Sequence, residues 1–403
     1  MTNIWKNIIN RQKSRKKMRG ALRLDKTSLK CVQTLLLVFS LLLVLLSLIT
    51  PVLVGTPVLI ETPECIDSQD YIKLQEHVTF EQRKGVDRYI IMFWNLENYF
   101  DTFNDPATSD DEFTPFGERY WSWKKFTSKR NNIAKVIISA GEINNLGKKQ
   151  NHSEVNYPSL VALAEVENRF VLEQLVRSTP LSLINYGIIH RDSPDERGID
   201  VALLYRKEVF RPLSADFIYV HLADSAAKTR LILYTKGVFE DLDTVHIFVN
   251  HWPSKFGGEA ISQPNRVAAA TALKNRCDSI LNKNVNANIL LTGDFNDTPN
   301  SVLFNNFKNF LNLAEVLSLR GEGTIRYRGK WELIDQFFVS KNLTNRSEPI
   351  FCDSVSMKIY RPAFLLERDK EYLGFKPKRS YTGPRYNGGI SDHLPIMFTI
   401  EKL

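Results

Sequence analysis

The residues best suited to chemistry stand at the end of an apolar stretch, Leu290 to Thr292, where Gly293 is followed by Asp294 and, two residues later, by Asn296. The apolar stretch predicts a short buried strand, and the glycine lets the backbone turn tightly at its end. Residues two apart on an extended chain point the same way, so Asp294 and Asn296 share one side. A carboxylate there can orient a water molecule or hold a cation, and an amide can hold an anionic oxygen. Taken alone, the stretch fits an Asx-rich turn equally well, because turn-forming residues follow it.

Other polar residues also follow the predicted ends of apolar strands. They are Asn95, Glu165, His251, Asp392 and His393. Strand ends are where a rigid sheet presents side chains to a cleft. Each residue alone could be a turn, a helix cap or a structural histidine, but their recurrence on separate strands indicates a site. Carboxylates without cysteine favour Mg²⁺, Mn²⁺ or Ca²⁺ over zinc.

Two further acids interrupt apolar strands, namely Asp335 and Asp200. A buried carboxylate without a partner is costly, so each acid is expected to have one. We predict that Asp335 pairs with His393 and that Asp200 pairs with His251. An acid beside an imidazole fixes its tautomer and raises its pKa.

The elements that must position these residues are mostly strands, some of which alternate with helical stretches. Strands are predicted at 89–94, 160–164, 199–205, 217–222, 230–238, 244–250, 288–292, 333–339 and 394–400, and helices at 127–140, 170–177, 263–281 and 304–317. Residues 357–389 read as a long, basic, irregular insertion. This pattern favours a mixed α/β sandwich over a purely parallel α/β fold.

The first 60 residues differ sharply from the rest of the chain. Residues 1–30 form a basic arm with a net charge of +9, so the remainder of the +8 chain carries only −1. Overall charge therefore gives no argument for nucleic-acid binding, and only a local basic groove could. Residues 31–60 contain no charged side chain, and a helix needs about 20 apolar residues to cross a bilayer.

This pattern predicts a single-pass anchor, at about residues 33–54, with a cytoplasmic N-terminus and an extracytoplasmic catalytic domain, periplasmic or extracellular. A cleaved signal peptide is the alternative, although its apolar core is usually shorter, about 7–15 residues. Residues 61–87 are expected to form a stalk and residues 88–403 the catalytic domain. The four cysteines lack zinc-site spacing, and the sequence leaves one disulfide open.

Six short motifs together resemble the endonuclease/exonuclease/phosphatase superfamily, which includes deoxyribonuclease I and the exonuclease III type of apurinic endonuclease. The motifs are Phe93-Trp94-Asn95, Ala164-Glu165-Val166-Glu167, Asn250-His251-Trp252, Gly293-Asp294-Phe295-Asn296, Ile334-Asp335 and Ser391-Asp392-His393. They occur in the family's order from about residue 88 onward, and the resemblance is to a bacterial, membrane-anchored type. Two departures leave the substrate open: Ala164 replaces a common glutamine, and residues 357–389 are inserted.

The resemblance implies a four-layered αββα sandwich of the deoxyribonuclease I type. It also implies a divalent metal ion, Mg²⁺ or Mn²⁺ with Ca²⁺ as an alternative, held by Glu165 with Asn95 and Asp392 beside it. Glu167 points the same way as Glu165, and we prefer Glu165 because it stands directly at the strand end.

By the same resemblance, Asp294 orients or deprotonates the attacking water, and Asn296 holds a phosphate oxygen and positions Asp294. His393, paired with Asp335, stabilises charge in the transition state. These roles agree with in-line attack on a phosphodiester, which needs an oriented water, a cation and donors on the equatorial oxygens.

The other predicted pair, His251 with Asp200, resembles the second active-site histidine of the deoxyribonuclease branch. Several side chains could contact a nucleic acid: Arg191, Arg197, Lys255, Arg266 and the basic loop 376–385 on phosphates, and Trp252 or Tyr381 on a base. The alternative for these charges is an ordinary solvated surface.

The sequence thus predicts a metal-dependent phosphodiesterase, an endonuclease in our first reading, with nucleic acid or another phosphoester as substrate. A phosphomonoesterase acting on a lipid, inositol or small-molecule phosphate is the alternative, and a non-catalytic, membrane-tethered binding domain is the third reading. No obligate protein partner is inferred. Motifs of calcineurin-like phosphatases and of serine hydrolases are absent from the sequence.

Overall fold

A computed structural model describes residues 88–403, except 144–155, 225 and 256. The basic arm, the anchor and the stalk predicted from the sequence lie outside these residues. Within the part of the chain that is described, no helix is both long enough and apolar enough to cross a membrane.

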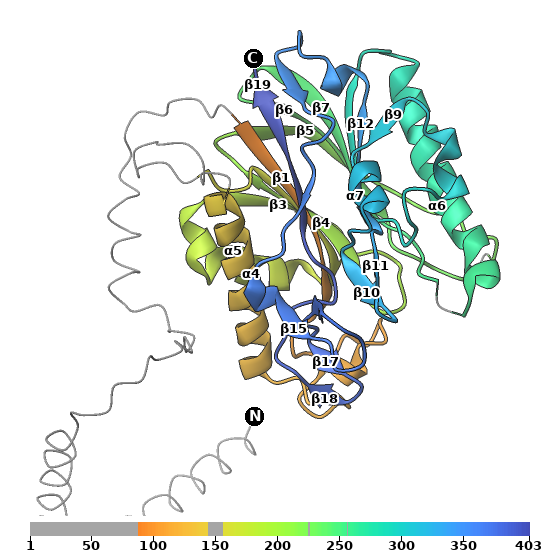
Figure 1. The fold of residues 1–403 in the computed structure, drawn as a ribbon. Helices are drawn as coiled ribbons and strands as arrows, with labels where there is room; N and C mark the ends of the chain where they lie inside the picture. Colours follow the sequence, from red (N-terminus) through yellow and green to blue (C-terminus); the bar gives the residue numbers. More distant parts are fainter. Residues whose placement is uncertain (1–87, 144–155, 225, 256) are drawn as a thin grey trace, which may run out of the picture. The chain divides into compact units, whose positions relative to one another are not determined.

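Two large sheets form the centre of the described region (Figure 1). The strands of the first, in the order β13-β19-β1-β2-β4-β3 with β14 beside β19, are β1 (Arg88–Tyr99), β2 (Leu160–Val166), β3 (Tyr186–His190), β4 (Asp200–Arg206), β13 (Ile350–Cys352), β14 (Lys358–Ile359) and β19 (Ile396–Lys402). The strands of the second, in the order β5-β6-β7-β8-β12-β9, are β5 (Phe210–Ile218), β6 (Ile232–Phe239), β7 (Asp243–His251), β8 (Asn288–Asp294), β9 (Phe310–Asn312) and β12 (Asp335–Ser340). Parallel and antiparallel pairs occur in both sheets, so the predicted mixed α/β fold is confirmed.

Helices cover the outer faces of the two sheets. The covering helices are α4 (Trp123–Ile143), α5 (Arg169–Arg177) and α6 (Glu259–Leu281), whereas the short α7 (Glu315–Leu319) places Leu317 against the apolar cluster between the sheets. One apolar cluster joins α4 and α5 to the first sheet, a second lies between the sheets, and a third joins α6 to the second sheet. The order across the molecule is therefore helix, sheet, sheet, helix (Figure 1).

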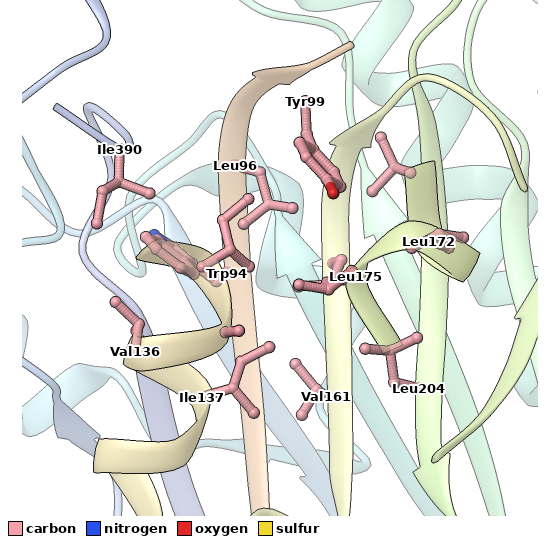
Figure 2. Packing of buried hydrophobic residues seen from close by; sticks show 14 of the residues in the cluster. Trp94, Leu96, Tyr99, Val136, Ile137, Val161, Leu172, Leu175, Leu204 and Ile390 are labelled. Atoms are coloured by element: carbon pink, nitrogen blue, oxygen red, sulfur yellow. The ribbon is translucent and has the colours of Figure 1, made fainter. Parts of the chain in front are cut away.

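Strand β1 shows why the central strands read as unbroken apolar runs. Trp94 packs in the cluster under α4, whereas Phe93, its neighbour in sequence, packs in the cluster between the sheets. Figure 2 shows Val136 and Ile137 of α4 beside Trp94. Because successive side chains point to opposite faces and both faces are covered, positions 89–94 of the strand are all apolar. Full burial of one such side chain is worth about 1.5–3 kcal/mol.

The helix predicted at residues 304–317 is wrong. This segment contains a 3-10 turn at Val302–Asn306, strand β9 and helix α7. The side chain of Asn312 bonds Gln336 and the backbone of Ala314, which fixes the segment as an edge strand on β12. Helical spacing in the sequence could not reveal these distant partners.

Two other helices extend beyond their predicted limits. Helix α4 begins at Trp123 and passes Gly141, where the sequence analysis ended it. Helix α6 begins at Glu259, so Ser262 lies inside it and bonds the carbonyl of Gly258 in place of capping the helix.

The insertion at 357–389 contains more regular structure than predicted. After β14 it carries two small hairpins, β15 (Leu366–Arg368) with β16 (Phe375–Pro377), and β17 (Tyr381–Thr382) with β18 (Arg385–Tyr386). A further hairpin, β10 (Ile325–Tyr327) with β11 (Lys330–Glu332), precedes it in sequence. Labels β15, β17 and β18 lie together at the lower end of Figure 1.

Candidate active site

Strand pairing brings the predicted residues to one region. In the second sheet, His251 on β7 and Asp335 on β12 are the direct neighbours of Asp294 on β8. In the first sheet, β1 places Asn95 beside Ala164, the residue before Glu165 on β2. Contacts of Asn95 with both Asp294 and Glu165 then join the two sheets.

Glu165 occupies a bulge in β2. Its backbone has a φ of +57°, and the pairing of β2 with β4 shifts register at this residue. Such an irregularity turns a side chain away from the ordinary alternation, at the cost of local strain. One carboxylate oxygen of Glu165 accepts a hydrogen bond from the backbone N–H of Asn98 at 2.9 Å, and the other lies 3.5 Å from the amide nitrogen of Asn95. The bulge therefore aims Glu165 at the junction of the sheets.

Asp294 is the central group of the site. Its Oδ2 accepts a hydrogen bond from Asn95 at 3.0 Å and lies 3.7 Å from Nε2 of both His251 and His393. Its Oδ1 accepts the backbone N–H of Asn296 at 2.9 Å. Burial raises the pKa of Asp294 to about 7, although the charge of His393 opposes this rise. Asp294 is thus a carboxylate that can gain or lose a proton near neutral pH.

His393 and Asp335 form the predicted pair. Nδ1 of His393 lies 2.8 Å from Oδ2 of Asp335. Burial works against the protonated imidazole, but Asp335 outweighs it and raises the pKa of His393 well above its usual value. The His393 segment is held on β1, because the indole of Trp94 donates to its carbonyl and Ser391 donates to the carbonyl of Asn95.

The predicted pairing of His251 with Asp200 is wrong. Asp200 binds Nε2 of His190 at 3.0 Å and the backbone N–H of Ser193. Strand β3, which the sequence analysis did not predict, places His190 beside Asp200 on β4. His251 remains in the site, yet its Nδ1 has no hydrogen-bond partner among the described residues. Burial, followed by nearby cationic groups such as Arg230, lowers the pKa of His251 well below its usual value.

The side chain of Asn296 is held by another residue, so it is only partly free to donate to a phosphate. Its side-chain nitrogen donates to the carbonyl of Trp252 at 2.9 Å, which leaves one N–H of that amide for another acceptor. Its backbone N–H holds Asp294, as described above.

Sequence reasoning missed two residues of the site, Glu97 and Lys129, and it named Arg379 only as part of the basic loop 376–385, which was expected to contact phosphates. Arg379 binds Glu97 and Asp392, each at 2.8 Å, and the backbone N–H of Ser380 also binds Glu97. Burial, and then the charge of Asp392, raise the pKa of Glu97 to about 7. Glu97 could have been found from its spacing, because it lies two residues beyond Asn95, just as Asn296 lies two beyond Asp294.

Lys129 on α4 fixes the insertion to the site. Its buried Nζ donates to the carbonyls of Glu97 and Ile390 and to the hydroxyl of Ser380, at 2.6–2.9 Å. Burial lowers its pKa to about 8. Nothing in the sequence near Lys129 pointed to this role, since its partners lie 32 to 261 residues away.

The predicted metal ligands fit a hard divalent cation. Glu165 keeps an oxygen whose shortest hydrogen bond within the described residues is 3.5 Å. Asp392 shares Arg379 with Glu97, whose pKa is raised by burial and then by the charge of Asp392. Asn95 turns its nitrogen to the acids and its oxygen to the N–H of Glu97, so it positions the carboxylates here. Oxygen donors that are crowded and only partly neutralised are typical of Mg²⁺ or Mn²⁺ sites.

Two other acid and histidine groups have closely spaced ligand atoms. One is Asp294, Asp335 and His393, and the other is His190, Asp192 and Asp200. Both already contain an acid–histidine hydrogen bond. Glu167 is the alternative to Glu165 as the main metal ligand. It is buried and accepts a hydrogen bond from the backbone N–H of Asp101, which favours Glu165 as the ligand.

The structure contradicts part of the predicted substrate-binding set. Trp252 is 1% exposed and packs against Phe295 and Phe304, so its ring cannot stack on a base. Arg266 is 0% exposed and binds Glu259, so it cannot reach a phosphate. Both assignments assumed that a residue after a strand or on a helix start faces solvent.

The remaining candidates are partly exposed. Arg197 bonds Asn98 and lies 3.9 Å from Glu165, which keeps it at the site. Lys255 is held by Asp297 and Glu259. Arg191 lies over the ring of Phe217.

The prediction that Tyr381 stacks on a base is wrong, because Tyr381 is 7% exposed and its ring packs against Trp121 and Tyr386.

The chain is similar to one known protein family and to several solved structures. A family model described as the Endonuclease/Exonuclease/phosphatase family matches residues 90–402. No curated protein matches the chain. Similar solved structures include humanized D. rerio TDP2, with 14% identity over 78% of this chain and 100% of that chain and a TM-score of 0.45.

A functionally unknown conserved protein from Enterococcus faecalis V583 is 13% identical over 78% of this chain and 100% of that chain, with a TM-score of 0.49. The human Nocturnin catalytic domain is 15% identical over 79% of this chain and 95% of that chain, with a TM-score of 0.45.

Proposed function

The chain belongs to the endonuclease/exonuclease/phosphatase family, and on that premise we propose that it is a metal-dependent phosphodiesterase that cuts nucleic acid. One observation carries the proposal. Asp294 is faced by an amide and by two imidazoles, one of them paired with an acid, while Glu165 lies within reach of the same amide. This is the set of groups that in-line attack on a phosphate requires.

Glu165 and Asp392, with Asn95 beside them, are the residues that would hold the divalent ion, Mg²⁺ or Mn²⁺. When bound, the ion supplies positive charge for the developing charge on the phosphate oxygens. Glu97 shares Arg379 with Asp392 and so helps to fix the position of that ligand.

Asp294 orients the attacking water and accepts its proton. Its buried carboxylate has a pKa near the working pH, which is what an efficient general base needs. Asn95 and the backbone N–H of Asn296 fix both of its oxygens. The same Asn296 has one side-chain N–H left to bind a phosphate oxygen.

His393 acts as a cation. Asp335 keeps it protonated, so it donates to an equatorial phosphate oxygen as negative charge develops there. His251 is neutral and donates a hydrogen bond without a full charge. Arg197, beside Glu165, contacts an adjacent phosphate of the strand.

We also propose that the chain is anchored in a membrane by residues 31–60, with the catalytic domain outside the cytoplasm. The uncharged stretch and the basic arm before it support this arrangement. Protease treatment of intact cells tests it, because an external domain is digested and an internal one is protected.

The function is tested on the full-length protein with Mg²⁺ or Mn²⁺ and with EDTA. Plasmid DNA, RNA, a generic phosphate diester and a generic phosphate monoester serve as substrates, and Asp294→Asn controls for contaminating nuclease. Metal-dependent cutting of nucleic acid by the natural chain alone supports the proposal. Hydrolysis of the monoester alone contradicts it and moves the chain to the phosphatases. No hydrolysis of any substrate by folded protein would also overturn it.

A further inference from the structure

A cavity of about 160 Å³ lies beside the candidate metal ligands. Its wall includes Asn98, whose backbone binds Glu165, and Arg379, whose side chain binds Asp392. A group bound in the cavity would therefore lie next to the phosphate being attacked. The far wall comes from Ser380, Tyr381 and Gly383 of the insertion, so the cavity is built by the segment that departs from the family pattern.

The rest of the wall is aromatic and carries a planar cation. Phe113 and Trp121 line it together with Tyr381. The guanidinium of Arg119 lies 5.1 Å from the ring centre of Tyr381 and 6.0 Å from that of Phe113. It is fixed there by Glu112 and by the carbonyl of Gly383, and about a quarter of its side chain is exposed.

The charges of the cavity argue against an anionic occupant. Lys129 donates to three oxygens, and Arg379 is matched by Glu97 and Asp392. Glu97 itself would repel an anion. An alkyl chain is also unfavourable, because it would cover these polar groups without bonding them.

A flat, neutral group with a polar edge matches the side chains that line the cavity. It can stack on the exposed part of the Arg119 guanidinium, which the buried rings of Phe113 and Tyr381 hold in place. A cavity of about 150 Å³ holds one benzene ring, so this space takes a single ring and not a base pair.

We propose that this cavity binds one unpaired nucleobase next to the scissile phosphate, so that the chain prefers single-stranded nucleic acid. The inference rests on the proposed function, because it assumes that the phosphate is attacked at Asp294. A paired base cannot enter, since a base must leave the duplex stack to reach such a pocket.

The test compares substrates and variants of the full-length protein. The substrates are a labelled single strand, the same sequence as a duplex, and a single strand in which every base has been removed. The natural chain is expected to cut the single strand faster than the other two. Loss of stacking of about 1–3 kcal/mol per base corresponds to a drop in kcat/KM of about 5- to 150-fold.

Arg119→Ala should remove this preference and leave the slow cutting of the base-free strand unchanged. Arg119→Lys keeps the charge and the stem but lacks the planar face, so it should restore little of the preference. Arg346→Ala is the matched control, because Arg346 also pairs with an acid and lies over an aromatic ring, but outside the cavity. It should behave as the natural chain does.

Binding gives a readout that does not depend on hydrolysis. Quenching of tryptophan fluorescence is measured as thymidine 5′-phosphate or ribose 5-phosphate is added in EDTA. Quenching by the nucleotide alone, lost in Arg119→Ala and kept in Arg346→Ala, supports the inference even if no strand is cut. Equal cutting of the three strands, or equal binding of both phosphates, overturns the inference and leaves the proposed function standing. Absence of cutting of every strand, with selective nucleotide binding, overturns the function instead.

Discussion

His251 and His393 approach the same carboxylate oxygen at the same distance, yet they differ in charge. Each Nε2 lies 3.7 Å from Oδ2 of Asp294, but the pKa of His393 is raised and that of His251 is lowered. The difference lies behind the rings. His393 has Asp335 on its Nδ1, whereas Nδ1 of His251 meets no acceptor among the residues described. The group behind an imidazole therefore decides its protonation more than the shared group in front of it does.

The largest effect is expected when the shared carboxylate is removed. Asp294→Asn should lower kcat by about 10³- to 10⁴-fold, because both histidines keep their places but no base remains to take the proton of water. Turnover of a nucleic acid strand with Mg²⁺ measures it, with Asp278→Asn on the surface of α6 as control. Activity within tenfold of the natural chain would show that another group is the base.

Removal of the charged histidine, His393, should lower kcat almost as much. His393→Ala should lower kcat by about 10²- to 10³-fold, the usual loss for one donor to a developing charge. Asp335→Asn should come close to the same loss, because it leaves His393 buried and neutral, as His251 is. The two are compared in kcat assays, with the exposed His221→Ala as control. A nearly active Asp335→Asn protein would show that hydrolysis does not need the carboxylate of Asp335.

Removal of the neutral histidine, His251, should lower kcat less. His251→Gln should lower kcat by about tenfold, because an amide can replace a neutral donor at the same position. His393→Gln should not be tolerated in this way, since glutamine cannot carry charge. Equal losses in the two glutamine variants would mean that the two histidines do the same work.

The smallest expected effect is measured by titrating the two histidines, which tests their difference in charge directly. Because His393 has a raised pKa and His251 a lowered one, NMR of histidine-labelled, metal-free protein should show His393 protonated and His251 neutral near pH 7. On lowering the pH, His251 should gain its proton only well below 6.5. The two signals are assigned with His251→Ala and His393→Ala, because each variant lacks one of them. A shared titration near 6.5 would remove the basis of the comparison.

The sequence was a good guide where a residue's environment is local. The sequence pattern identified Asn95, Glu165 and Asp294, which the structure brings together, although β1 and β2 continue past Asn95 and Glu165 to Tyr99 and Val166. The pairing of Asp335 with His393 also followed, since a buried acid inside a strand needs a partner. The mixed α/β fold rested on the same local signals.

The sequence failed where the deciding contact is distant. Asp200 was given His251 because strand β3, which carries the true partner His190, was not recognised. Trp252 and Arg266 were taken as exposed, but α6 and the aromatic cluster around Phe295 cover them. Lys129 was not found at all, and Arg379 was named only within the basic loop 376–385, because their bonds to Glu97 join residues 32 and 282 positions apart.

The position of β19 has a consequence for the order in which this protein can become active. It lies between β13 and β1 in the first sheet, and the bonds from Trp94 and Asn95 to the His393 segment span 299 and 296 residues. Chains are made from the N-terminus, and contacts so distant in sequence form late. A growing chain that has not yet reached Ser391 has Asp294 and Glu165 but lacks both His393 and the strand that holds it. The candidate active site therefore stays incomplete throughout almost all of synthesis, and a chain terminated before Ser391 lacks the charged histidine that faces Asp294.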